Sequence, residues 1–142
     1  MKIAVAESCT GGMLGARLTA IAGSSDVVLG GVIAYADQVK ESKLGVSAET
    51  LRAHGAVSEE TAREMATGVC VKFGAEVGVS ISGIAGPGGG TAEKPVGTVC
   101  IAVASGGALT STRVQMIGDR DEIRRRSTQA ALNMVRRRFI ES

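Results

Sequence analysis

The stretch IAVAESCTGG, residues 3–12, decides the fold that we expect for this chain of 142 residues. Its apolar first half, Ile3–Ala6, is typical of a buried strand, and the polar and glycine residues that follow indicate a turn. Apolar residues then recur at helical spacing from Met13 to Ile21, and Gly23 fits the position that ends a helix. A strand, a turn and a helix leading to a second strand predict a parallel pair of strands.

The rest of the chain continues this alternation and ends in a hairpin and a helix. Ser58 and Asp119 are good N-caps for two of the helices. The sequence predicts strands over Val27–Ala34, Val77–Ile81, Val96–Ala104 and Leu109–Ile117, short helical turns over Ala36–Leu51, a helix from Ser58 to Phe73 and a last helix from Asp119 to Phe139. We therefore expect a single α/β domain over residues 1–142. It has three layers, α/β/α, around a five-stranded mixed sheet in which one strand is antiparallel to the rest.

Composition restricts the classes of function. A net charge of +2 and only three aromatic residues argue against nucleic-acid binding, which needs basic patches or aromatic faces. No apolar run reaches the ~18 residues of a membrane span, and the N-terminus does not have the pattern of a signal peptide. The three cysteines have no paired spacing, so we expect neither disulfides nor a zinc site, and a cytoplasmic setting. Neither glycine pattern of dinucleotide- or ATP-binding loops occurs at a strand–helix turn.

Polar side chains follow the first three predicted strands at the point where each ends. They are Ser8, Tyr35 and Ser82, and Lys40 comes five residues after Tyr35. Ligands of open parallel sheets bind at the carboxyl ends of the strands, so these side chains indicate a site. A serine activated by a neutral lysine is the natural route to acyl transfer here, because the chain has one histidine, His54, which lies in a predicted turn.

Each of these residues also has an ordinary structural explanation. Ser8 fits a turn or a helix cap, and Lys40 fits a solvated helix position. Cys9 is a possible nucleophile, with His54 as the partner it would need. The arginines of the last helix, at 124–126 and 136–138, are interpreted as a solvated face, with an acidic partner or nucleic acid as the alternative.

Eight stretches, in order along nearly the whole chain, resemble a known family. They are AESCTGG at Ala6–Gly12, AGSS at Ala22–Ser25, GGVIAYADQVK at Gly30–Lys40, LGV at Leu44–Val46, HGAVS at His54–Ser58, SISGIAGPGGG at Ser80–Gly90, EKPVGTV at Glu93–Val99 and GDRDEIR at Gly118–Arg124. The family is that of the C-terminal domain of CinA, the competence-damage-inducible protein, whose members are nicotinamide-nucleotide amidases. Family members usually begin with a helix before the first strand, and the larger ones carry a separate N-terminal domain; this sequence begins at the strand.

The resemblance implies a hydrolase of pyridine nucleotide salvage. It would deamidate nicotinamide mononucleotide to nicotinic acid mononucleotide and ammonia by a serine–lysine mechanism without a metal or other cofactor. Carried over residue by residue, the resemblance makes Ser25 the nucleophile and Lys40 the base, with Tyr35 orienting the lysine or relaying a proton. Ser8 and Ser82 would then help to stabilise the oxyanion.

Substrate contacts are expected from two turns and one arginine. Backbone N–H groups of the turns after the first and third strands suit an oxyanion or a phosphate, and the guanidinium fork suits a phosphate. The expected residues are Thr10, Gly11, Gly12, Ser82, Gly83, Gly86 and Arg120. A homodimer or higher homo-oligomer is the default for a small enzyme.

The position of Ser25 conflicts with simple geometry, because it precedes the second strand and so falls at the opposite end of the sheet from Ser8 and Tyr35. Either residues 24–29 curl back, or Ser25 acts across a subunit interface, or Ser8 is the nucleophile. Two other functions stay open: a non-catalytic nucleotide-binding regulatory module, and an amidase of another small carboxamide.

Overall fold

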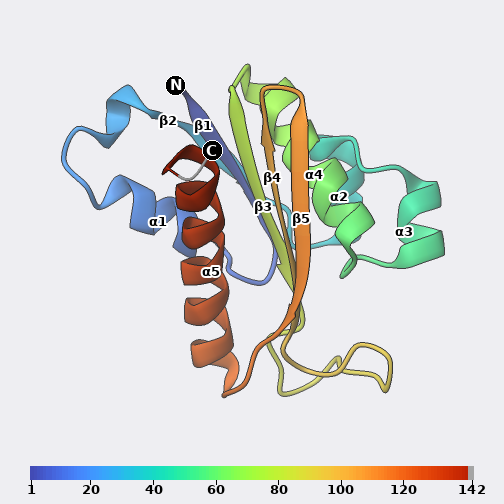
Figure 1. Cartoon of the computed structure of the whole chain (residues 1–142). Helices are drawn as coiled ribbons and strands as arrows, with labels where there is room; N and C mark the ends of the chain where they lie inside the picture. Colours follow the sequence, from blue (N-terminus) through green and yellow to red (C-terminus); the bar gives the residue numbers. More distant parts are fainter. Residues whose placement is uncertain (141–142) are drawn as a thin grey trace.

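The strands form one twisted sheet with helices on both faces (Figure 1). The computed structural model describes residues 1–140, in which the sheet order is β2-β1-β3-β4-β5. The strands are β1 (Ile3–Glu7), β2 (Val28–Ile33), β3 (Val77–Gly83), β4 (Thr98–Ser105) and β5 (Ala108–Gln115). β1 is parallel to both β2 and β3, whereas β4 is antiparallel to β3 and to β5. The predicted mixed sheet, with one strand opposed to the rest, is therefore confirmed.

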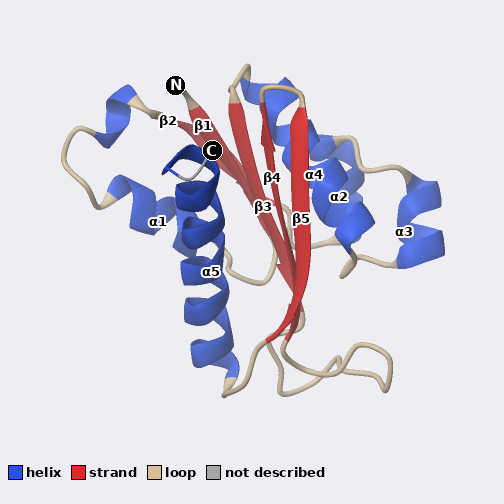
Figure 2. Ribbon diagram, viewed as in Figure 1, coloured by secondary structure: helices blue, strands red, loops and turns tan. Residues whose placement is uncertain are grey.

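The helices make the two outer layers of the predicted α/β/α sandwich (Figure 2). One layer holds α1 (Met13–Thr19) and α5 (Arg120–Ile140), and the other holds α2 (Asp37–Leu44), α3 (Ala48–His54) and α4 (Glu59–Phe73). Nearly every residue of β3 is buried, because helices cover both faces of this strand. None of the helices within residues 1–140 is long and apolar enough to cross a lipid bilayer.

Several predicted boundaries are wrong: β5 ends at Gln115 and not at Ile117, α3 extends to His54, which the sequence placed in a turn, and two further corrections matter for the site. The first helix ends at Thr19, and Gly23 instead opens a short 3₁₀ turn, η1 (Ser24–Asp26), with a φ of 87° that favours glycine. β4 begins at Thr98, because Val96 lies in the glycine-rich loop and packs against Gly86. Local apolar patterns extended both elements too far, since loop residues can also be packed.

Both predicted N-caps are confirmed. Ser58 Oγ accepts a hydrogen bond from the Thr61 N–H at 3.1 Å. Asp119 Oδ1 accepts from the Glu122 N–H at 2.9 Å, and Glu122 Oε1 accepts in return from the Asp119 N–H at 3.1 Å. This reciprocal pair fixes where α5 begins, directly before Arg120.

The packing of α2 on α4 is the closest helix contact that supports the site. A Cβ atom on Gly68 of α4 would lie 1.8 Å from the carbonyl oxygen of Leu44, at the end of α2. Leu44 and Val46 are buried in the core beneath this contact. α2 is thus pinned at its C-terminus, which fixes the helix that carries Lys40.

We expect Gly68→Ala to lower the free energy of unfolding by about 1–3 kcal/mol, because the added methyl group would force α2 away from α4. Thermal unfolding followed by circular dichroism measures the loss. Thr67→Ala, at the exposed neighbouring position of α4, is the matched control and should leave the midpoint nearly unchanged. Equal midpoints for the two variants would contradict the close approach.

Candidate active site

A cavity of about 180 Å³ opens where β1, β2 and β3 end. The three strands run parallel, so their carboxyl ends meet at one edge of the sheet, and the Ala34 N–H donates to Glu7 O at 2.7 Å to tie two of these ends together. The α3–α4 loop and the start of α5 supply the remaining walls. The lining residues are Ser8, Cys9, Tyr35, Asp37, Lys40, Ala56, Val57, Ser82, Gly83, Ala85 and Arg120. Six residues that the sequence predicted for the site are therefore brought together: Ser8, Tyr35, Lys40, Ser82, Gly83 and Arg120.

The amine of Lys40 is the centre of this cavity. Its side chain is 1% exposed, and Nζ donates to the carbonyl oxygens of Ala34 at 2.9 Å and Tyr35 at 3.1 Å. The third contact of Nζ is with Ser8 Oγ at 3.2 Å. Lys40 reaches these partners from the first turn of α2, directly after the end of β2. The expectation of a solvated lysine is thereby excluded.

Burial lowers the pKa of Lys40, because desolvation disfavours the ammonium form. Asp37 acts in the opposite direction: its Oδ1 lies 3.8 Å from Nζ and raises the pKa, though by less than burial lowers it. A neutral amine has two hydrogens and one lone pair. The two carbonyl oxygens can take the hydrogens, which leaves the lone pair for the hydroxyl of Ser8.

Ser8 and Ser82 differ in what their hydroxyl groups are free to do. Ser82 Oγ donates to the carbonyl oxygen of Ala56 at 2.8 Å, so the hydroxyl of this cavity-lining residue can only accept a further hydrogen bond, and the predicted donation to an oxyanion is not available. Ser8 has the amine of Lys40 as its side-chain partner, and its N–H donates to Ile81 O at 2.9 Å. Ser8 therefore has a base beside it, and Ser82 is positioned as an acceptor.

The turn after β1 does not present its amides to the cavity. The Leu14 and Gly15 N–H groups, at the start of α1, both donate to the buried carboxylate of Glu7 at 2.9 Å. Thr10 Oγ1 donates to the same carboxylate at 2.6 Å, and the Gly11 N–H donates to Ser8 O. The structure places neither Thr10, Gly11 nor Gly12 along the cavity, since the carboxylate of Glu7 takes the anion position at this helix terminus.

Arginines from α5 approach the same edge of the sheet. Arg120 lines the cavity, donates to Gly86 O at 2.8 Å and lies 3.5 Å from the hydroxyl of Tyr35. Gly86 thus touches the site through Arg120, while Gly83 lines it directly. Arg124, one helical turn further, donates to the carbonyl oxygens of Cys9 and Thr10 at 3.0 and 3.2 Å. Arg124 is not part of a solvated face, as the sequence suggested, but holds the loop that carries Ser8.

Ser25 lies at the opposite end of the sheet in a single chain. It belongs to η1, whose neighbour Val27 accepts a hydrogen bond from the N–H of Ile3, the first residue of β1, at 2.9 Å. β2 then begins at Val28, so residues 24–29 do not curl back toward Lys40. Of the three ways to resolve the conflict, the structure leaves an interface between copies, or Ser8.

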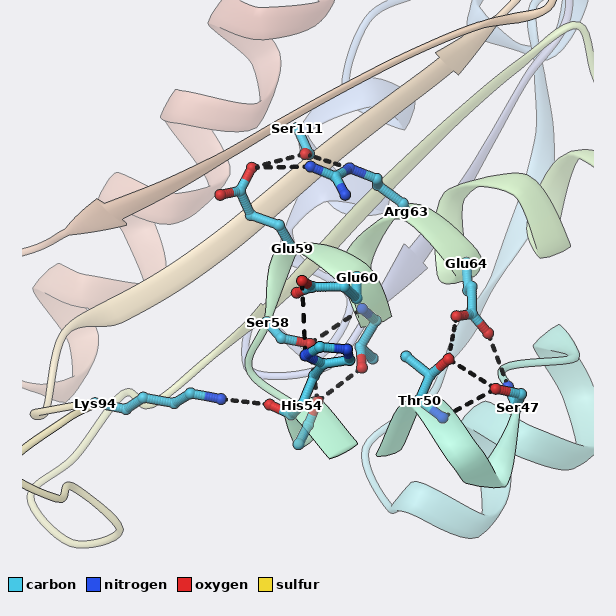
Figure 3. A network of polar contacts seen from close by, with 12 residues as sticks. Ser47, Thr50, His54, Ser58, Glu59, Glu60, Arg63, Glu64, Lys94 and Ser111 are labelled. Atoms are coloured by element: carbon cyan, nitrogen blue, oxygen red, sulfur yellow. Dashed lines mark hydrogen bonds and ion pairs between the residues drawn. The ribbon is translucent and has the colours of Figure 1, made fainter. Parts of the chain in front are cut away.

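The cysteine–histidine alternative is not supported by the geometry. His54 is half-exposed at the end of α3, where its Nδ1 lies 3.6 Å from Glu60, within a polar network outside the cavity (Figure 3). Lys94 donates to the carbonyl oxygen of His54 in the same network at 2.5 Å. Cys9 does line the cavity, but burial raises the pKa of its thiol to about 11. A protonated thiol is a poor nucleophile.

Two residues of the site were missed from the sequence. Asp37 sits three residues before Lys40 on the first turn of α2, and that spacing places both on one helix face. Arg124 sits four residues after Arg120 on α5, which again puts both on one face. Helical spacing was the available signal in both cases.

Comparison with known proteins gives a consistent result. The family model described as "CinA C-terminal domain" matches residues 1–139. A CinA-like protein from Gemmatimonas aurantiaca is 60% identical over 139 residues, covering 98% of this chain and 32% of that protein. One from Chlorobaculum tepidum is 53% identical over 137 residues, covering 93% and 32%. The chain thus spans about a third of the length of these relatives.

Solved structures agree with this match. The competence/damage inducible protein CihA from Agrobacterium tumefaciens has a TM-score of 0.93 and 44% sequence identity, covering 95% of this chain and 83% of that one. A CinA superfamily protein from Escherichia coli has a TM-score of 0.92 and 34% identity, covering 95% and 78%. The likeness therefore extends over nearly the whole fold described above.

We expect Cys9 to resist alkylation by iodoacetamide at pH 8. A thiol whose pKa is about 11 is roughly 100-fold less ionised at that pH than an ordinary thiol, and Cys9 is also buried. Mass spectrometry of the labelled peptides measures the rate, with half-buried Cys70 as the internal comparison and the urea-unfolded chain as the fully reactive control. Labelling of Cys9 before Cys70 would contradict a protonated thiol.

Proposed function

Because the chain belongs to the family of the CinA C-terminal domain, we propose that it is a hydrolase that converts nicotinamide mononucleotide to nicotinic acid mononucleotide and ammonia, with Ser8 as nucleophile and Lys40 as base. The reaction and the substrate are those that the resemblance of the motifs implies. The single observation that carries the assignment of roles is the 3.2 Å contact between the buried amine of Lys40 and Ser8 Oγ.

The first half of the reaction forms an ester and releases ammonia. Ser8 Oγ attacks the carboxamide carbon while its proton passes to Lys40 Nζ. The resulting tetrahedral intermediate carries its negative charge on the former carbonyl oxygen, beside the new ammonium group. When the intermediate collapses, the C–N bond breaks, the proton moves from Lys40 to the leaving nitrogen, and ammonia departs.

The second half regenerates the serine. A water molecule gives a proton to the neutral Lys40 and attacks the ester carbon, and the C–O bond to Ser8 breaks. Lys40 returns the proton to Ser8 Oγ, and the carboxylic acid product leaves as its carboxylate. Lys40 thus acts first as base and then as acid in each half, which requires a pKa below that of a free lysine.

Three further residues give the site its preference for a carboxamide on a nucleotide. Ser82, whose proton is held by Ala56, accepts a hydrogen bond from the carboxamide N–H, which a carboxylate product does not have. Arg120 binds the 5′-phosphate through the side of its guanidinium that faces the cavity. Tyr35, whose carbonyl holds Lys40 and whose hydroxyl lies near Arg120, connects the two ends of the substrate.

The rival proposal of a regulatory nucleotide-binding module uses the same cavity without the chemistry. A buried lysine is costly, and a module that only binds nucleotide has no need of one beside a serine. An amidase of another small carboxamide would keep the pair of Ser8 and Lys40 but would not need Arg120. Comparison of free nicotinamide with the nucleotide as substrates distinguishes the two kinds of amidase, because only the nucleotide has a phosphate for Arg120.

We expect the chain to release ammonia from nicotinamide mononucleotide, and Lys40→Ala and Ser8→Ala each to reduce kcat/KM by at least about 10³-fold, because nucleophile and base act as a unit. A coupled ammonia assay measures the rate. Mass spectrometry of acid-quenched enzyme should find the acyl adduct on the Ser8 peptide.

Ser25→Ala is the comparison that decides the nucleophile. An adduct on the Ser25 peptide, with full loss of activity in Ser25→Ala, would overturn the role of Ser8 but not that of Lys40. Full activity in Lys40→Ala would overturn the serine–lysine mechanism. Binding of the nucleotide without release of ammonia would favour the regulatory module.

We expect Asp37→Asn to move the acidic limb of the pH profile of kcat/KM to lower pH. The carboxylate of Asp37 raises the pKa of Lys40, so its removal lowers that pKa and keeps the amine neutral, and therefore active as a base, in more acidic solution. Glu41→Gln, at an exposed position of the same helix away from the cavity, is the matched control and should not move the limb. A shift to higher pH in Asp37→Asn would contradict the assignment of the limb to Lys40.

A further inference from the structure

One edge of the sheet lacks two of the features that normally prevent strands from associating, charged residues and proline, and has a single irregularity of register. β2 is an edge strand with the sequence VLGGVI, which contains neither a charge nor a proline. Exposed edges are usually protected by charged residues, proline or bulges. The one slip in register of β2 against β1 lies at Leu29, and residues Gly30–Ile33 follow in regular order. The opposite edge, β5, instead has the sequence ALTSTRVQ, which is rich in hydroxyl groups and contains Arg113.

Exposed apolar side chains are frequent on β2 and in the segments directly before and after it. Half of the large hydrophobic residues that are exposed in the described part of the chain lie within residues 21–35: Ile21, Val27, Leu29, Ile33 and Tyr35. Ile33 is 57% exposed and Tyr35 is 63% exposed. Concentrated apolar exposure of this kind marks an interaction surface.

A hollow of about 230 Å³ lies beside Ile33, between α1 and β2. Its floor is formed where Gly12, Gly15 and Gly31 contribute no side chain. Ile33 lines this hollow, so a protruding apolar side chain and a hollow that could receive one lie on one continuous surface. A surface that carries both halves of a contact is complementary to itself, which is what a two-fold interface between identical chains requires.

We propose that this edge is the interface of a homodimer in which β2 pairs antiparallel with β2 of a second copy, and that each copy completes the other's active site. A two-fold axis at the middle of the strand, between Gly30 and Gly31, joins the two sheets into one of ten strands. The unpaired backbone groups of both edges are then satisfied by each other.

The antiparallel direction fixes what the second copy brings to the site. Residues that precede β2 in one copy come to lie beside residues that follow β2 in the other. η1, with Ser24 and Ser25, therefore meets Tyr35 at the mouth of the cavity that holds Lys40. This placement follows from the proposed pairing and the fold, and, since residues 24–29 do not curl back, it is the remaining arrangement that takes Ser25 to the lysine.

The size of the cavity gives an independent reason for a second copy. Sites that enclose a small molecule usually measure ~300–1,000 Å³, and this one measures about 180 Å³. A single chain can therefore enclose the carboxamide end of a nucleotide, while the rest lies against the exposed ring of Tyr35. η1 of the partner would close this side. This last step rests on the proposed function, whereas the pairing of β2 does not.

The first experiment measures the oligomeric state by sedimentation, without substrate. We expect the unmodified chain to be a dimer and Leu29→Lys to be a monomer. Leu109→Lys, on the opposite edge strand, is the matched control, because the two leucines are 43% and 44% exposed, and it should remain a dimer. Circular dichroism verifies that both variants are folded. A monomeric unmodified chain, or a dimer that survives Leu29→Lys, overturns the interface.

The second experiment tests the direction of pairing. In the double variant Ser25→Cys, Tyr35→Cys a short bismaleimide should link two chains efficiently, because position 25 of one copy lies beside position 35 of the other. Each single variant and the unmodified chain, with its own cysteines, are the controls and should give no more than background linking. Linking in either single variant equal to that of the double variant overturns the antiparallel pairing.

Activity separates this proposal from the proposed function. We expect the Leu29→Lys monomer to release ammonia from nicotinamide mononucleotide at least tenfold more slowly than the Leu109→Lys dimer. Equal rates for monomer and dimer overturn the completion of the site by the partner. A dimer without any amidase activity leaves the interface standing and rejects the proposed function instead.

Discussion

An amine can be buried in a protein only where the protein supplies acceptors for its hydrogens, and the described structure is organised around one such amine. The carbonyl oxygens that hold Lys40 are those of Ala34 and Tyr35, so β2 must end where it does. The helix that carries Lys40 must start directly afterwards, and its far end is fixed by the contact between Leu44 and Gly68. Because the third contact of the amine is Ser8, the end of β1 is determined as well. Two strand ends and two helices thus share one constraint.

The loop after β1 shows a second use of charge, which supports the first. Glu7 binds the amides at the start of α1 from below, and Arg124 binds the carbonyl oxygens of Cys9 and Thr10 from α5. The negative Glu7 thus binds N–H groups and the positive Arg124 binds carbonyl oxygens around one short loop, which also carries Ser8. This arrangement gives Ser8, the proposed nucleophile, a fixed position without an additional partner for its hydroxyl. In the proposed reaction the phosphate of the substrate would then be bound elsewhere, and Arg120 is a cation that lines the cavity.

The sequence predicted the fold and the centre of the site because both follow from local patterns. Apolar runs ending in polar residues located β1, β2 and β3, and the rule that strand ends meet brought Ser8, Tyr35 and Ser82 together. The sequence wrongly placed Thr10 in the cavity. Thr10 instead donates a hydrogen bond to the buried carboxylate of Glu7, whose orientation cannot be inferred from a local pattern. The short turn η1 was also missed, since three residues give no periodic signal. A role for Ser25 at this cavity requires a second chain, as proposed above, and the pattern of one chain carries no direct information about a second one.

Cys9 stands next to the proposed nucleophile, and its protonated thiol has a consequence for the conditions in which the site can operate. Oxidants such as peroxides attack thiolates, and a thiol with a pKa of about 11 is almost never in that form inside a cell. The side chain is also buried, which keeps bulky oxidised products from forming without local unfolding. The sulfur atom of Cys9 therefore lines the cavity without the sensitivity to oxidation that the thiolate of a cysteine hydrolase has. If the chain is the hydrolase proposed above, its acyl transfer should continue during oxidative stress, when an enzyme that depends on a thiolate would stop.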